Sequence, residues 1–155
     1  MAKNPSAKPA NFSAHVTVAA IIRNEQAQYL LVEEEKEGRR VFNQPAGHLE
    51  ADENLIQACE RETLEETGYK VRATGVVGIG LFTAPGGAVY HRTTFVCELQ
   101  QEISAGPQDS DIIARHWLTL KQIRERQTQL RSPLVLKAIE QFEDGHCYPL
   151  RMLYP

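Results

Sequence analysis

The chain has 155 residues, a net charge of −3, and 42% hydrophobic and 24% charged side chains. This length and composition fit one compact domain, expected at residues 14–155 behind a flexible N-terminal arm, residues 1–13. An acidic balance without a basic block argues against a protein that mainly binds nucleic acid. No segment approaches the ~18 apolar residues of a membrane span, and no secretion signal stands out. A cytoplasmic monomer or homodimer is therefore expected, with no membrane partner.

Residues 15–45 contain three segments that predict β-strands. Apolar runs at 15–22 and 29–32 predict two strands, and residues 41–45 predict a third, short strand with a turn. The charge run at 33–40 is interpreted as a solvated loop, with the alternative that its arginines border an anionic site. Arg23 could pair with a phosphate or be an ordinary surface arginine. Phe42 could stack on a pyrimidine or belong to the core, and Gln44 offers an amide edge to a base.

Residues 54–68 predict a helix with both ends marked. Asn54 followed by Gln57 three residues later is typical of an N-cap with a capping box, and Gly68 suits the position after the last helical turn. At 100° per residue, Glu65 and Glu66 lie roughly 60° and 40° on either side of Glu62. Three carboxylates therefore share one end of this helix.

That cluster is unfavourable without a cation. Glu62 has like-charged neighbours in Glu65 and Glu66, and anions at a helix C-terminus oppose the helix dipole, for a cost of roughly 1–2 kcal/mol. Arg61 can pair with Glu65 four residues later, but the basic residue then precedes the acidic one, which is the less favourable order in a helix. Carboxylate ligands without nearby Cys or paired His suit Mg²⁺, with Mn²⁺ as an alternative, better than zinc. The alternative is an acidic helix end in water.

The second half of the chain predicts more strands and two helices. Residues 71–82 carry three glycines among strand formers and predict a bent strand, which the turn at 84–87 joins to a partner at 89–99. Residues 117–118 predict another strand and 120–126 a short helix. Ser132 and Pro133 begin a helix that ends near Gly145. Three widely spaced cysteines, without a Cys-x-x-Cys pair, predict reduced and mostly buried thiols.

The helix and the loop before it resemble a known family. The pattern is Gly47, five residues, Glu53, seven residues, and then the run Arg61-Glu62-x-x-Glu65-Glu66-x-Gly68. It resembles the Nudix box of the MutT-type hydrolases. Thr63 replaces a larger aliphatic residue, and Ala46 stands where glycine is commoner. Neither change removes a charged group. The resemblance implies an α/β/α sandwich with a mixed β-sheet.

The resemblance also implies an activity, which is Mg²⁺-dependent substitution at phosphorus in a small diphosphate. Glu62, Glu65 and Glu66 would hold metal and activate water, the Ala46 carbonyl would be a further ligand, and Glu53 with Arg61 would hold the loop and helix together. The physical logic agrees, because a metal must neutralise the charge of a diphosphate and lower the pKa of the attacking water. Which glutamate acts as the base stays open.

Further segments resemble one phosphatase subgroup of that family. They include residues 42–50, 109–111, 130–135 and 148–150. That subgroup is associated with releasing phosphate from nucleoside di- and triphosphates and from thiamine-pathway diphosphates such as hydroxymethylpyrimidine diphosphate. Asp111 lies where related hydrolases supply another acidic group. The alternatives are a non-catalytic metabolite-binding module, expected to lack the box carboxylates, and an RNA 5′-end pyrophosphohydrolase, expected to carry a basic surface.

Overall fold

The computed structural model describes residues 12–154 and contains seven strands and three α-helices in that range. The expected N-terminal arm falls largely on residues 1–11, outside the described part. The strands are β1 (His15–Ile21), β2 (Gln28–Lys36), β3 (Arg39–Asn43), β4 (Ala46–His48), β5 (Tyr69–Thr83), β6 (Val89–Glu102) and β7 (Ile112–Thr119). The helices are α1 (Leu55–Thr67), α2 (Leu120–Glu125) and α3 (Pro133–Glu143), with short 3₁₀ turns at Gln127–Gln129 and Leu150–Met152.

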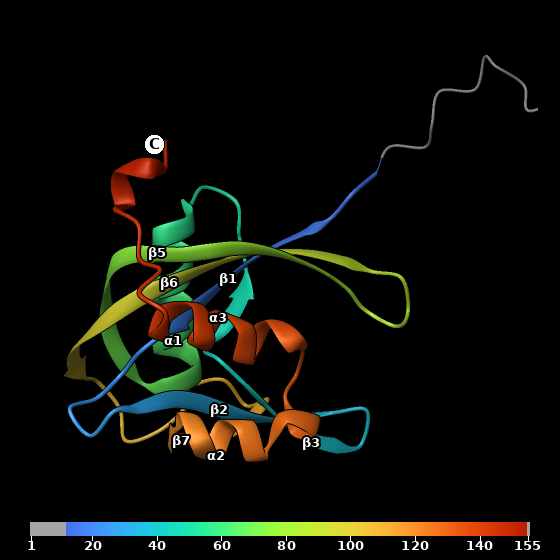
Figure 1. The fold of residues 1–155 in the computed structure, drawn as a ribbon, viewed down its shortest axis with the longest axis vertical. Coiled ribbons are helices and arrows are strands. Elements are labelled where there is room, and N and C mark those ends of the chain that lie inside the picture. The colour runs from blue at the N-terminus through green and yellow to red at the C-terminus, as the bar shows by residue number, and fades with distance from the viewer. Residues whose placement is uncertain (1–11, 155) are drawn as a thin grey trace, which may run out of the picture.

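Two small sheets make up the β-structure. The first has the strand order β4-β1-β6-β5 and the second has the order β3-β2-β7. The β1–β6 pair is parallel and the other pairs are antiparallel, so the strand arrangement is mixed, as expected. Ile22, just after β1, accepts a hydrogen bond from Leu30 N in β2 at 3.0 Å, which joins the two sheets. The long β5–β6 hairpin extends beyond the rest of the fold (Figure 1).

Helices cover both faces of the strands, which confirms the predicted α/β/α sandwich (Figure 1). Side chains alternate between the two faces of a strand. In β1 and the residue after it, Val18, Ala20 and Ile22 belong to the apolar cluster under α1, whereas Ile21 belongs to the cluster under α3. Both clusters contain fully buried aliphatic side chains. This explains why residues 15–22 read as a continuous apolar run rather than an alternating one.

The charged segment 33–40 is not a solvated loop, so that expectation was wrong. Residues up to Lys36 continue β2, and Arg39 already begins β3. Glu33 and Glu34 are only 8% exposed. Glu33 is stabilised by His116 Nε2 at 2.8 Å and Arg40 NH1 at 3.0 Å. Burial alone would raise the pKa of Glu33, but these two partners outweigh it and lower that pKa.

Other predicted strands and helices are present, but some of them begin or end at different residues than predicted. β5 is bent, with register shifts at three points, two of which are at Gly75 and Gly78. β7 is longer than the two residues predicted for it. Pro133 begins α3 as expected, but the Ser132 side chain makes no capping hydrogen bond. All three cysteines are free, and two of them, Cys59 and Cys97, are buried, as expected, whereas Cys147 is exposed. No helix between residues 12 and 154 is long and apolar enough to cross a membrane.

Candidate active site

Helix α1 is capped at both ends by the residues from which its ends were predicted. The Asn54 side chain accepts a hydrogen bond from Gln57 N, and the Gln57 side chain accepts one from Asn54 N, each at 2.9 Å. Gly68 takes a left-handed conformation, with φ of 75°, and its N–H donates to Leu64 O. The last turn of α1, with its glutamates, is therefore held in a defined place.

Arg61 joins α1 to the loop that precedes it. Its Nε and NH2 donate to the two oxygens of Glu53 at 2.9 and 2.7 Å, and NH2 also donates to His48 O at 3.0 Å. Its NH1 donates to Glu62 at 2.9 Å and to Glu65 at 3.3 Å. The hydrogen bond with Arg61 lowers the pKa of Glu53. Glu53 and Arg61 thus fasten the loop to the helix, which agrees with the role that the family resemblance implied.

Glu62 packs directly against the backbone of β4. A side-chain carbon placed on Gly47 would overlap the Glu62 carboxylate, so only glycine leaves room for it. Burial raises the pKa of Glu62, and Arg61 partly offsets this effect. The glycine that opens the Nudix box therefore has a direct structural reason.

Glu66 is the most deeply placed of the three helix carboxylates, with 6% exposure. Its Oε2 accepts a hydrogen bond from Ala46 N at 2.9 Å, which links α1 to the start of β4. The pKa of Glu66 is raised to about 9, mainly by burial; the hydrogen bond from Ala46 N opposes this shift, and the neighbouring Glu62, Glu34 and Asp109 contribute to it. A cation beside Glu66 would favour the charged carboxylate, so this position fits a metal ligand.

The C-terminal end of α1 also positions a second acidic loop. The Glu65 carbonyl accepts hydrogen bonds from Gln108 N at 2.8 Å and Asp109 N at 2.9 Å. Asp109 Oδ1 in turn accepts from Asp111 N at 2.9 Å. A carbonyl that a helix end leaves unpaired is thereby satisfied, and two aspartates are brought to the side of Glu66.

These elements surround a cavity of about 420 Å³. Its wall carries six carboxylates against three basic side chains. The acidic residues are Glu34, Glu50, Glu62, Glu66, Asp109 and Asp111, and the basic ones are Lys36, Arg92 and Arg131. A polyanionic substrate would meet a net negative wall here unless a cation is bound with it.

The structure places four of the predicted residues on this cavity: Ala46, Glu62, Glu66 and Asp111. Glu65 does not line it; its side chain is 47% exposed and turned to Arg61. Between residues 12 and 154, no three acidic, His or Cys side chains converge closely enough to enclose a metal ion as they stand. The donor set of Glu62, Glu66 and the Ala46 carbonyl is nevertheless all oxygen, which suits a hard divalent cation.

Three predicted substrate contacts lie elsewhere. Arg23 follows β1 and lies with its guanidinium carbon 5.9 Å from the centre of the Tyr29 ring, and it does not line the cavity. Phe42 points to the opposite face of β3 from Asn43 and contacts the His116 ring. Gln44 is 1% exposed, beneath the cavity wall, where its Oε1 accepts from Arg92 NH2 at 2.9 Å. Gln44 therefore positions an arginine in this structure.

Several charged residues of the cavity were not predicted from the sequence, among them Arg92 and Glu34. Arg92 lies in β6 with 7% exposure, and Glu34 in β2 lies 3.2 Å from Arg131 Nε, although the direction is poor for a hydrogen bond. Burial lowers the pKa of Arg92 to about 10, so it stays charged at neutral pH. For Arg92, a charged residue inside the predicted strand at 89–99 was the available signal, whereas Glu34 lies within the charge run 33–40 and offered no such signal.

Comparison with known proteins shows which family the chain belongs to. The family description "NUDIX domain" matches residues 13–138. Phosphatase NudJ of Escherichia coli K12 is 40% identical over 142 residues, which is 92% of each chain. A solved NUDIX hydrolase from Nitrosomonas europaea is 39% identical and superposes with a TM-score of 0.88 over 92% of this chain and 97% of that one. The MutT protein of Methanosarcina mazei, at 21% identity, shares the fold, with a TM-score of 0.69 over 88% and 98% of the two chains.

The chain belongs to the Nudix hydrolase family. Within it, the chain is similar to the NudJ phosphatases, which is the subgroup indicated by the segments around residues 42–50 and 130–135. The class of reaction that follows is hydrolysis of diphosphate linkages.

Proposed function

We propose that residues 14–155 form one domain that hydrolyses small diphosphates with Mg²⁺, or Mn²⁺ in its place, and releases inorganic phosphate. The proposed substrates are nucleoside di- and triphosphates and thiamine-pathway diphosphates such as hydroxymethylpyrimidine diphosphate. The similarity to NudJ phosphatases supports this choice of product. The observation that carries the proposal is the cavity itself, where Glu62 and Glu66 face Lys36, Arg92 and Arg131.

Each group on the cavity has a part in this proposal. Glu62, Glu66 and the Ala46 carbonyl would hold the metal, joined by Glu65 once its carboxylate leaves Arg61. The bound metal would neutralise phosphate charge and lower the pKa of the attacking water. Lys36 and Arg131 would bind oxygens of the reacting phosphate groups, and Arg92, which also lines the neighbouring cavity, would add positive charge. Asp111, on the loop held by α1, would orient the substrate or its metal from the opposite wall.

Glu66 is proposed to act as more than a ligand. Its hydrogen bond from Ala46 N fixes one carboxylate oxygen, and this leaves the other oxygen to face the cavity. Because burial disfavours the charged form, Glu66 would bind its cation with a concentrated negative charge in a poorly solvated setting. The same carboxylate, or Glu62 beside it, would accept a proton from the attacking water.

The direct test is to identify the first products. Purified protein is incubated with a nucleoside triphosphate, a nucleoside diphosphate and hydroxymethylpyrimidine diphosphate, with Mg²⁺, with Mn²⁺ and with EDTA. We expect inorganic phosphate to appear first and only with metal. Pyrophosphate and a monophosphate as first products would contradict the phosphatase assignment. Tight binding of these compounds without turnover would favour the metabolite-binding alternative.

A further inference from the structure

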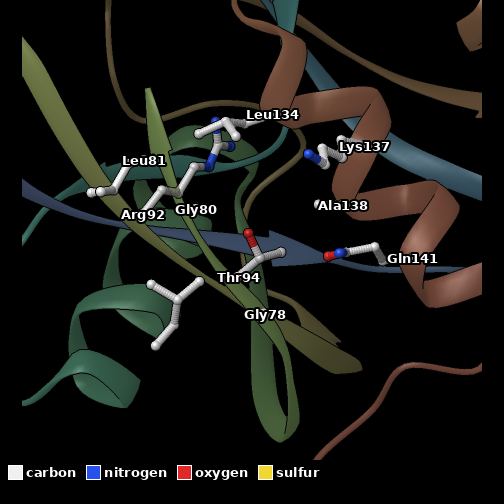
Figure 2. Close-up of a pocket in the computed structure, with 10 residues that line it drawn as sticks. Gly78, Gly80, Leu81, Arg92, Thr94, Leu134, Lys137, Ala138 and Gln141 are labelled. Carbon is white, nitrogen blue, oxygen red and sulfur yellow. The ribbon is translucent and has the colours of Figure 1, made fainter. Parts of the chain in front are cut away.

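A second cavity, of about 270 Å³, lies between the β5–β6 hairpin and α3 (Figure 2). It adjoins the first cavity, because Arg92 and Leu134 line both. Its polar wall consists of Arg92 and Thr94 from β6 with Lys137 and Gln141 from α3. Figure 2 shows the polar ends of Lys137 and Gln141 extending from α3 towards the strands.

The charge of this cavity is opposite to that of its neighbour. Among the described residues, no Asp or Glu lines it, whereas two cations do. Two positive side chains on one small cavity repel each other, and a bound anion would relieve that repulsion. The first cavity, with its six carboxylates, attracts cations instead. The two cavities therefore differ in the ligands that they favour.

Arg92 provides a second and independent observation. Its NH2 donates to Gln44 Oε1 at 2.9 Å and to Asn43 Oδ1 at 3.2 Å, which fixes the guanidinium. Its Nε is buried and has no hydrogen-bond partner among residues 12–154. A buried charge that the described side chains compensate only in part is costly, and an anion on the cavity that Arg92 lines would offset that cost. An oxyanion is the acceptor that matches a fixed guanidinium best.

The backbone of β5 makes the space. Gly78 and Gly80 line the cavity. A side-chain carbon on Gly80 would lie 2.9 Å from Leu134 Cδ2, and one on Gly78 would lie 3.1 Å from Gln141 Oε1. Glycine inside a strand often marks a place where a ligand approaches the backbone. The glycines that predicted only a bent strand thus also keep the gap between β5 and α3 open.

From these observations we infer that the cavity between β5, β6 and α3 is a second anion site, which binds a phosphate group other than the one that is hydrolysed. Arg92 and Lys137 bind its oxygens, and Thr94 and Gln141 complete the polar wall. The phosphate group is either free inorganic phosphate or an additional phosphate carried elsewhere on the substrate. Binding at this site does not require the metal or the hydrolysis proposed above.

The test measures inorganic phosphate binding by titration calorimetry in EDTA. Without metal, the carboxylates of the first cavity oppose phosphate binding there. The second site is reported by the difference between wild type and Lys137→Met, because Lys137 lines the second cavity and not the first. We expect saturable binding in the wild-type chain and about tenfold weaker binding in Lys137→Met, which corresponds to the loss of one charge-assisted hydrogen bond. Lys121→Met removes an exposed lysine of α2 outside both cavities and should bind like wild type.

A steric pair of variants checks the same site without changing charge. Gly78→Ala narrows the cavity and should weaken phosphate binding, whereas Gly86→Ala, which has open space around it, should not. Thermal melts confirm that each variant is folded. Absence of saturable phosphate binding in wild type, or equal affinity in Lys137→Met and Lys121→Met, would overturn the inference even if the enzyme hydrolyses diphosphates normally.

A kinetic arm with Mg²⁺ separates the two sources of the phosphate group. If the substrate supplies it, Lys137→Met should raise KM for a 3′-phosphorylated nucleoside 5′-diphosphate but not for its 3′-hydroxyl counterpart. If free phosphate supplies it, added phosphate should change the hydrolysis of both substrates equally in wild type and less in Lys137→Met. Either pattern supports the site. Identical kinetics of Lys137→Met and wild type in every condition would count against it.

Discussion

At the scale of the residue, burial of Glu66 favours its protonated form, whereas binding a metal ion requires the charged carboxylate. Its carboxylate is 6% exposed and has a pKa raised to about 9, against an ordinary value of 4.5. Without metal, the folded protein therefore binds a proton at Glu66 over the pH range in which the unfolded chain has lost it. Folding then becomes less favourable as pH rises from about 4.5 towards 9.

The variant Glu66→Gln removes this pH dependence. Glutamine keeps an oxygen that can accept from Ala46 N and carries no charge to desolvate. In EDTA, the variant should match wild type near pH 5 and exceed it by about 1 kcal/mol or more at pH 8, a rise in Tm of roughly 2–4 °C or more. Thermal melts across this pH range are the measurement. With Mg²⁺, phosphate release should fall by orders of magnitude.

Glu65→Gln is the matched control, because its side chain is 47% exposed. It should show no stability gain that grows with pH. A Glu66→Gln protein that is less stable than wild type at pH 8 in EDTA, yet turns over normally with Mg²⁺, would mean that Glu66 has a structural role only.

At the scale of the element, the connection between α1 and the loop before it depends on Arg61. Its guanidinium binds both oxygens of Glu53 and the His48 carbonyl at once, and its side chain is 23% exposed. An ammonium group cannot reproduce this planar, forked arrangement. The loop that carries Gly47 and His48 is thus held by a geometry that only arginine supplies.

We therefore expect Arg61→Lys to destabilise the protein by about 1–3 kcal/mol. Hydrolysis should fall more than tenfold, because the loop that supplies the Ala46 carbonyl is no longer fixed against α1. Denaturant unfolding and phosphate release measure the two effects. Arg72→Lys, in an exposed pair with Glu98, should change neither by more than a small amount. Equal effects of the two substitutions would show that the Arg61 network is dispensable.

Elements with local signals were predictable from the sequence, and those stabilised at long range were not. Helix α1 ends where Asn54 and Gly68 indicate, because a cap is decided within a few residues. The strand at Glu33–Lys36 was missed because its buried carboxylates have partners far away in the sequence: Glu33 contacts His116 and Glu34 contacts Arg131, besides the nearer Arg40. Local composition alone favoured a loop there.

The candidate site divides in the same way. Ala46, Glu62 and Glu66 were predicted because one motif holds them all, and they do meet on the cavity. Arg92 was missed, because its place between the two cavities depends on how β6 packs beside β5 and α3. Gln44 was assigned to the substrate, although in the structure it holds Arg92 from beneath. The spacing of residues within one motif predicts that their side chains lie close together. Contacts between elements that are distant in the sequence cannot be predicted from that spacing.

At the scale of the whole molecule, the core and the cavity are built from different residues. Two apolar clusters, one under α1 and one under α3, contain fully buried side chains from four strands or more, and the carboxylates of the cavity belong to neither. Folding is thus driven by apolar burial, and a cation bound at the cavity adds to stability without being required for it.

Removing metal should therefore abolish hydrolysis and leave the fold intact. We expect circular dichroism in excess EDTA to match that of the Mg²⁺-loaded protein. Adding Mg²⁺ to about one hundred times its Kd should stabilise the native state by about 2.7 kcal/mol, a rise in Tm of roughly 5–10 °C. In Glu66→Gln this Mg²⁺-dependent rise should shrink, because one charged ligand is lost. Unfolding of the wild-type chain by EDTA would instead make the ion a structural component, and undiminished turnover in EDTA would remove the metal from the proposed reaction.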